Sequence, residues 1–134
     1  MKPSMLDTDI FSEFLRGNDK AFANIEKYLL QYKSFNISII TYYEILSGLL
    51  YKDAKKQLEA FERIVALNNI IPLTVKSVKI AANIQADLRK KGSVIGHTDT
   101  LIAGIAIENN LQLITNNTAH FNRINQLDIA NWLL

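Results

Sequence analysis

The sequence predicts an α/β fold with a mostly parallel central sheet, because short apolar segments alternate along the chain with longer amphipathic ones. The short segments are rich in β-branched and aromatic residues and are bounded by polar residues, as buried strands are. The longer segments repeat their apolar residues at helical spacing. They are long enough to connect parallel strands by right-handed crossovers, so we expect helices on both faces of the sheet.

Four segments are predicted to be strands, and a fifth short strand is expected near the end of the chain. The four are PSML at 3–6, FNISII at 35–40, IIPLTV at 70–75 and LQLIT at 111–115. The fifth is expected within LDIANWLL at 127–134. Neither a sequence repeat nor a Pro/Gly/Ser-rich linker interrupts this pattern, so no domain boundary is proposed.

Six segments are predicted to be helices. They are IFSEFLRG at 10–17, KAFANIEKYLLQYK at 20–33, TYYEILSGLLY at 41–51, AKKQLEAFERIVALNN at 54–69, SVKIAANIQADLRKKG at 77–92 and HTDTLIAGIAIENN at 97–110. The first and the fifth end on glycines that favour a helix C-terminus, Gly17 and Gly92. The fifth carries one stripe at helical spacing, made of Val78, Ala81, Ala82, Gln85 and Leu88.

Length and composition fit one globular domain over residues 1–134, with 49% hydrophobic and 21% charged residues. The chain has no cysteine, which excludes disulfides, zinc-thiolate sites and cysteine nucleophiles. The acid at Asp7 precedes any signal-peptide core, and the longest apolar run, LIAGIAI at 101–107, is too short to cross a bilayer. We therefore expect a cytoplasmic protein with no membrane partner. A net charge of +2 does not by itself indicate nucleic acid.

Acidic side chains lie where predicted strands give way to helices. Asp7 ends the first strand, Glu44 follows the second by a few residues, and Asp99 heads the helix that precedes LQLIT. In parallel sheets, ligands bind beyond the carboxyl ends of the strands. The three acids are therefore candidates for one site.

Each acid also has a purely structural interpretation. Asp7 or Asp9 can cap the N-terminus of the helix that follows. The segment Thr41-Tyr-Tyr-Glu44 matches a capping box, in which the glutamate reaches back to the first backbone amide. Asp99 near a helix start is favoured by the helix dipole.

Two details favour a metal site over these structural roles. Asp99 shares a helical stripe with Ile102 and Ala106, so it points toward packed protein, where an unpaired carboxylate is costly. Glu44 shares its face with Gly48, which leaves room above the carboxylate, and no lysine or arginine adjoins these acids in sequence. Mg²⁺ or Mn²⁺ held by carboxylate oxygens would neutralise them. Such an ion supports phosphodiester hydrolysis by an activated water.

Three blocks of the sequence resemble the PIN-domain ribonucleases of the VapC toxin family. They are MLDTDIFSEFL at 5–15, SIITYYEILSGL at 38–49 and GSVIGHTDTLIAGIAIENNLQLITNNTAHFNRINQLDIANW at 92–132. The resemblance implies a PIN-like α/β/α sandwich and a Mg²⁺- or Mn²⁺-dependent endoribonuclease that cuts single-stranded or loop regions of RNA. It also implies a toxin of a toxin–antitoxin pair, with a cognate antitoxin and a homodimeric state.

The resemblance carries three acids onto positions of this chain as catalytic residues and metal ligands, namely Asp7, Glu44 and Asp99. Asp9 stands where relatives often have asparagine, so it is expected to be a cap first and a helper second. His97, at the start of the helix that carries Asp99, is expected to be structural.

The chain departs from the family pattern at the fourth acid. Where relatives place an acid in the TNN segment, this chain has Asn117 and, before Phe121, His120. Thr115 and Asn117 can still form hydrogen bonds at the site. His120 has three readings, as a neutral metal ligand, a phosphate contact or a solvated surface histidine. The number of metal ions therefore stays open.

RNA binding requires cations that meet phosphates. The candidates at helix ends and loops are Arg16, Lys52, Arg89, Lys90, Lys91 and Arg123, of which Arg89, Arg16 and Lys91 are preferred. The alternative for each is an ordinary solvated charge. An antitoxin groove is expected to be lined partly by an aromatic stripe of Phe11, Phe14, Phe22, Tyr28 and Tyr32, most of it core.

The rival function is a catalytically weakened PIN-like module that binds RNA or protein, which the missing fourth acid suggests. A phosphoacceptor receiver-like domain is disfavoured, because its late strand should end on a lysine and LQLIT runs into Asn116.

Overall fold

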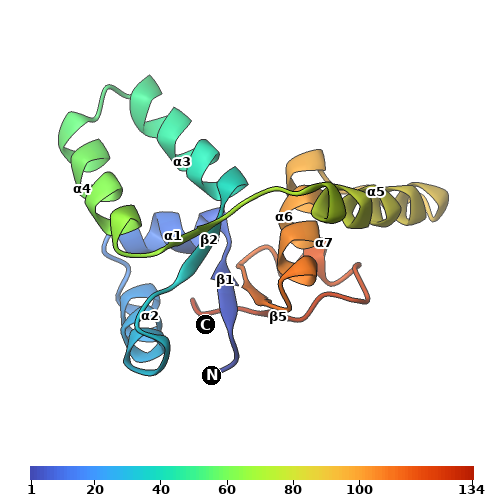
Figure 1. Ribbon diagram of the computed structural model, residues 1–134, viewed down its shortest axis with the longest axis horizontal. Coiled ribbons are helices and arrows are strands. Elements are labelled where there is room, and N and C mark those ends of the chain that lie inside the picture. Colours follow the sequence, from blue (N-terminus) through green and yellow to red (C-terminus); the bar gives the residue numbers. More distant parts are fainter.

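Five parallel strands form the central sheet of the computed structural model, which describes residues 1–134 (Figure 1). They are β1 (Ser4–Leu6), β2 (Asn36–Ser38), β3 (Asn69–Ile71), β4 (Gln112–Ile114) and β5 (Ile129–Ala130). Their order in the sheet is β3-β2-β1-β4-β5, and every neighbouring pair is parallel. The predicted α/β class, the parallel sheet and the fifth short strand are confirmed.

Seven helices cover the two faces of the sheet. They are α1 (Thr8–Leu15), α2 (Asp19–Tyr32), α3 (Ile39–Tyr51), α4 (Lys55–Ala66), α5 (Val75–Lys90), α6 (His97–Glu108) and α7 (Thr118–Phe121). Figure 1 shows α1 to α4, coloured blue to green, on one side of the strands and α5 to α7 on the other. The result is the predicted α/β/α sandwich. None of the helices combines the length and the apolar character that are needed to span a membrane.

Side chains of the adjacent strands β1 and β4 alternate between the two faces of the sheet, and this divides the hydrophobic core into two clusters. Met5 of β1 pairs in register with Leu113 of β4, and both pack with residues of α5, α6 and α7. The next pair, Leu6 and Ile114, packs on the opposite face with residues of α1 to α4. Successive strand residues point to opposite faces, so a three-residue strand is enough to anchor both layers.

Two predicted strand boundaries were wrong. Ile39 and Ile40 begin α3 instead of extending the second strand, because the Ser38 hydroxyl accepts the Thr41 N–H at 3.0 Å and caps the helix. The third strand ends at Ile71, and α5 begins at Val75 with a capping box of Thr74 and Ser77. The short helix α7 was not predicted.

The buried face of α5 differs from the stripe predicted from the sequence. Ser77, Ala81, Ile84 and Leu88 form the buried face of α5, whereas Val78 is 42% exposed. A serine enters the core here because its hydroxyl is satisfied within the capping box at the start of the helix.

Candidate active site

Asp7 and Thr115 follow directly after the adjacent strands β1 and β4. The Asp7 N–H donates to the Ile114 carbonyl at 2.8 Å, which continues the strand pairing by one residue. The Thr115 hydroxyl then donates to Asp7 Oδ2 at 2.8 Å, and the Thr8 N–H donates to Asp7 Oδ1 at 2.9 Å. Asp7 is thus the N-cap of α1 as well as a buried carboxylate at the carboxyl edge of the sheet. Its structural role and its predicted site role are compatible.

Asp9 lies in the first turn of α1 and faces the same edge. Its Oδ1 accepts the Ile10 N–H at 2.7 Å, and its Oδ2 accepts the Asn116 N–H at 3.0 Å. It therefore ties α1 to the turn after β4. Asp7, not Asp9, is the helix cap.

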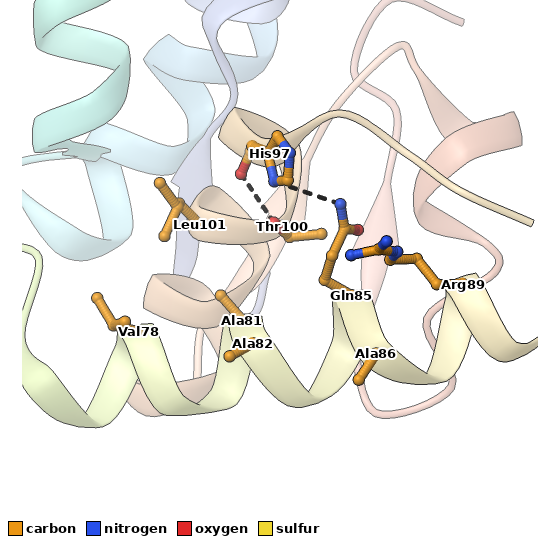
Figure 2. A pocket seen from close by; sticks show the side chains of 9 residues that line it. All are labelled: Val78, Ala81, Ala82, Gln85, Ala86, Arg89, His97, Thr100 and Leu101. Carbon is orange, nitrogen blue, oxygen red and sulfur yellow. Dashed lines mark hydrogen bonds between the residues drawn. The ribbon is translucent and has the colours of Figure 1, made fainter.

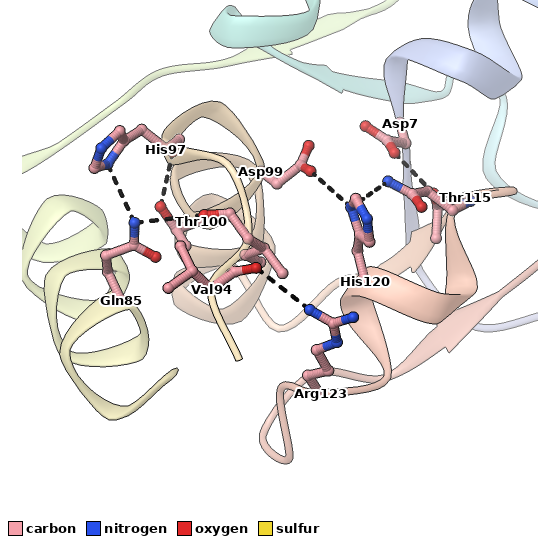
Figure 3. Close-up of polar contacts among 11 residues, drawn as sticks. Asp7, Gln85, Val94, His97, Asp99, Thr100, Thr115, His120 and Arg123 are labelled. Carbon is pink, nitrogen blue, oxygen red and sulfur yellow. Dashed lines mark hydrogen bonds and ion pairs between the residues drawn. The ribbon is translucent and has the colours of Figure 1, made fainter. Parts of the chain in front are cut away.

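Helix α6 brings Asp99 to this edge from the opposite layer. The helix has Gly96 at its N-cap, and no side chain caps it. Asp99 Oδ2 lies 3.5 Å from His120 Nδ1, and Figure 3 shows the two side chains pointing toward each other, with Asp7 and Thr115 beyond the imidazole. The His97 side chain points to the other side of α6, toward Gln85 (Figure 3).

The pKa values of Asp7 and Asp9 are raised. Burial raises the pKa of Asp7 from 3.8 to about 7, and the negative charge of Asp9 adds to that effect, with a smaller contribution from Asp99. Burial and the Asp99 charge also raise the pKa of Asp9. No lysine or arginine forms an ion pair with any of the three. The cluster of Asp7, Asp9 and Asp99, which we call the aspartate cluster, therefore carries uncompensated negative charge.

Glu44 is linked to the aspartate cluster through Thr8. It lies within α3, and its Oε1 accepts the Thr8 hydroxyl at 2.6 Å, while Thr41 Oγ1 lies 2.9 Å from the same hydroxyl. The alternative interpretation of Thr41 and Glu44 as a capping box is wrong, because α3 begins at Ile39 and Ser38 caps it. Sequence reasoning missed Thr8, although its position directly after Asp7 is the signal that would have found it.

Asn117 and His120 lie on the turn and short helix that follow β4. The Asn117 N–H donates to Thr115 Oγ1 at 3.0 Å, and the Asn117 side-chain nitrogen lies 2.9 Å from His120 Nδ1. The supporting residues predicted from the sequence, Thr115, Asn117 and His120, are thus connected to one another and to Asp7.

The chemistry of these groups suits a hard divalent cation. No three histidine, aspartate or glutamate side chains converge as a ready-made metal site. Mg²⁺, however, is typically held by one or two carboxylates and completed by water and substrate phosphates. Asp7 and Asp99 present carboxylate oxygens that lack a lysine or arginine partner.

Glu44 also lines a groove of about 430 Å³ between α1, α3 and α4. Its apolar residues include Leu15, Ile45 and Leu49, and its cations are Arg16 and Lys52. The aromatic stripe does not line this groove. As predicted, part of it is core, since Phe11 and Tyr28 are buried, and one ring, Phe22, is exposed on α2. Its contact with an antitoxin stays a prediction.

The three preferred cations lie on different parts of the surface. Arg16 lines the Glu44 groove and pairs with Glu13 at 2.8 Å. Arg89 lines a separate groove along α5 and α6 with Gln85 and His97 (Figure 2). Lys91 follows the last turn of α5. RNA binding by these cations stays a prediction.

Comparison with known proteins gives consistent results over nearly the whole chain. The family model described as "PIN domain" matches residues 4–127. The chain is 30% identical to Ribonuclease VapC2 of Rickettsia felis over 96% of each chain. It is 27% identical to the tRNA(fMet)-specific endonuclease VapC of Shigella flexneri, again over 96% of each.

Among solved structures, VapBC2 from Rickettsia felis bound to a DNA fragment from its promoter contains a chain with a TM-score of 0.87 and 30% identity. That match covers 96% of this chain and 98% of the other. DNA-bound VapBC from Salmonella typhimurium gives the same TM-score at 27% identity, covering 98% of this chain and 99% of that one.

Proposed function

The chain belongs to the PIN-domain family, among the VapC-type ribonucleases, and we propose that it is the toxin of a toxin–antitoxin pair, a Mg²⁺- or Mn²⁺-dependent endoribonuclease. The RNA is cut by hydrolysis of phosphodiester bonds in single-stranded or loop regions. Membership rests on the family match over residues 4–127 and on the VapC relatives named ribonucleases. The metal requirement rests on the aspartate cluster.

One observation carries the metal requirement, namely that three aspartates share one edge of the sheet without a lysine or arginine partner. Burial and mutual repulsion raise the pKa of Asp7 to about 7, so its ionised form is costly in the metal-free protein. A structural ion pair would have lowered this pKa. A cluster of carboxylates with raised pKa values and no lysine or arginine partner is instead typical of a cation-binding site.

The residues of the site divide into ligands and positioning groups. We assign Asp7 and Asp99 as ligands of the cation. When bound, the ion polarises the scissile phosphate and lowers the pKa of a water molecule. Thr115 holds Asp7 in one orientation through its hydroxyl. Glu44, fixed by Thr8, approaches from α3 and acts as the third acid of the site.

We assign the Glu44 groove to a segment of the cognate antitoxin. The groove combines apolar residues with Glu44, Arg16 and Lys52, so it offers both burial and charge to a peptide. Thr8, the residue next to Asp7, is one of the residues that line the groove. A peptide in this groove would therefore lie beside the catalytic acids. We also propose that the toxin forms a homodimer, as the family resemblance implies.

Cleavage of RNA by the purified protein, freed of antitoxin, tests the proposal. Total cellular RNA and purified initiator tRNA are incubated with Mg²⁺, Mn²⁺ or EDTA; the tRNA is included because two relatives are named tRNA(fMet)-specific endonucleases. Asp99→Asn keeps the side-chain shape and removes the charge, while Asp87→Asn removes an exposed charge of α5 as a control. We expect metal-dependent cleavage that is lost in Asp99→Asn and retained in Asp87→Asn.

Two outcomes would contradict the proposal. Cleavage that persists in EDTA would exclude the metal requirement. A folded protein that cuts neither RNA with either ion would favour the PIN-like binding module instead.

A further inference from the structure

We propose that His120 supplies a nitrogen ligand to the cation at the aspartate cluster and makes the site prefer Mn²⁺ to Mg²⁺. The inference rests on the proposed function, because it requires that Asp7 and Asp99 hold a cation. It assigns a role to a residue that the carboxylate chemistry alone leaves unused.

The imidazole of His120 is held at the cluster by a chain of hydrogen bonds. The Asn117 side-chain amide lies 2.9 Å from His120 Nδ1, the Asn117 N–H donates to Thr115 Oγ1, and that hydroxyl donates to Asp7. Phe121, the next residue of α7, is fully buried and anchors the short helix to the core. The position of the ring is therefore coupled to the position of Asp7.

The contacts of Nδ1 suit a ring nitrogen that offers its electron pair. At 2.9 Å, the Asn117 amide makes a good hydrogen bond to an unprotonated Nδ1. The 3.5 Å from Nδ1 to Asp99 Oδ2 is much longer than the roughly 2.8 Å of a charge-assisted hydrogen bond. In the tautomer that leaves Nδ1 without a proton, Nδ1 and the Asp99 carboxylate face each other as two electron-pair donors.

A divalent cation bound between Nδ1 and the Asp99 carboxylate would remove the repulsion between these two electron-pair donors. The 3.5 Å between Nδ1 and Asp99 Oδ2 is short enough for His120 and Asp99 to hold one ion together. Nδ1 would then turn from the Asn117 amide to the ion, and water would accept the amide proton instead. Figure 3 shows the imidazole lying between Asp99 and the Asp7–Thr115 pair.

The ligand type then sets the metal preference. Mg²⁺ is a hard cation that takes oxygen ligands and retains several waters. Transition-metal ions accept imidazole nitrogen more readily. A site built from Asp7, Asp99 and His120 should therefore bind Mn²⁺ more tightly than Mg²⁺, and a carboxylate at position 120 should reduce the difference.

Pulsed EPR of Mn²⁺ bound to the full chain tests the inference directly, because it detects nitrogen coordinated to the ion. The chain has two histidines, and His97 lies on the other side of α6 against Gln85, so His97→Gln is a matched control for His120→Gln. We expect nitrogen coupling in the unmodified protein and in His97→Gln, and none in His120→Gln.

Metal titration by calorimetry supplies the second measurement. His120→Gln should weaken Mn²⁺ binding by at least about tenfold, since even outer-shell partners of metal ligands are worth about 10- to 100-fold in affinity. Mg²⁺ binding should change much less. His120→Glu should bring the two affinities closer together.

The outcomes separate this inference from the proposed function. Bound Mn²⁺ that shows no nitrogen coupling, yet is lost in Asp99→Asn, overturns the role of His120 and leaves the carboxylate site standing. The role is also overturned if His120→Gln weakens RNA binding while the Mn²⁺ spectrum and affinity stay unchanged, because His120 would then contact phosphate. A protein that binds neither ion contradicts both proposals.

Discussion

Thr115 donates its hydroxyl proton to Asp7 Oδ2 across 2.8 Å, and this bond joins residues that are 108 positions apart in the sequence. The register of β1 and β4, with Leu6 opposite Ile114, places the two side chains next to each other. The centre of the site is therefore fixed by strand pairing. The same hydroxyl accepts the Asn117 N–H, so it also sets the turn that carries His120.

Replacing Thr115 by valine should reduce both stability and RNA cleavage. Valine keeps the shape of the side chain but leaves the buried Asp7 oxygen and the Asn117 amide without their partner. The expected loss in the free energy of unfolding is about 1 to 3 kcal/mol, measured by urea denaturation. Thr115→Ser retains the hydroxyl and should keep most of the cleavage activity. Equal activity of the valine and serine variants would show that the bond does not matter for function.

The stability of the metal-free protein should fall as the pH rises from about 4 to about 7. The pKa of Asp7 is raised from 3.8 to about 7, so over this range the folded state holds a proton that the unfolded state has lost. The raised pKa of Asp9 contributes with the same sign. The free energy of unfolding in EDTA should therefore be greater at pH 5 than at pH 8, by on the order of a few kcal/mol.

Asp7→Asn is the control for this pH dependence. It removes the charge and keeps a similar shape, so the variant should lose most of the slope and should be more stable than the unmodified protein at pH 8. A variant with an unchanged slope would assign the pH dependence to other groups.

Mg²⁺ or Mn²⁺ should stabilise the protein at pH 8 by neutralising the aspartate cluster. An ion that binds only the folded state contributes about 2.7 kcal/mol at one hundred times its Kd. The thermal midpoint should therefore rise with metal concentration and return to its starting value on addition of EDTA. Asp7→Asn should show little of this rise. An equal rise in the variant would place the ion elsewhere on the protein.

Much of the fold was predictable because its signals are local. The strands are recognisable as short runs rich in β-branched residues. Asp7 and Asp99 are recognisable because an acid at a strand end or helix start can be read from the sequence alone. The boundary at Ile39 was not predictable in this way, since a short apolar run fits a strand or a buried helix equally well. Ser38 decided it by capping α3.

The remainder of the site depends on tertiary packing. The place of Thr8 next to Asp7 is visible in the sequence, but its partner Glu44 is not. The 3.5 Å approach of His120 to Asp99 is not visible either, since both pairs meet only when α3 and α7 pack at the sheet edge. The choice of the buried face of α5 also depends on tertiary packing. Ser77 is buried in place of the more apolar Val78 because α6 approaches α5 closely at Gly104.

Gly104→Ala should separate α6 from α5 and disturb the position of Asp99. A Cβ at Gly104 would lie 2.4 Å from the Ser77 carbonyl oxygen and 3.2 Å from Ala81 Cβ, and backbone cannot yield as a flexible side chain does. Overpacking of this kind costs about 1 to 3 kcal/mol, more than the helix propensity that alanine adds, at most about 1 kcal/mol. Gly48→Ala is the matched control, because it lies in α3 with nothing within 4 Å of its added Cβ. Urea denaturation should show a loss for Gly104→Ala and none for Gly48→Ala, and RNA cleavage by Gly104→Ala should fall below that of the unmodified protein. If both variants are equally stable, the contact between α5 and α6 is looser than the structure shows.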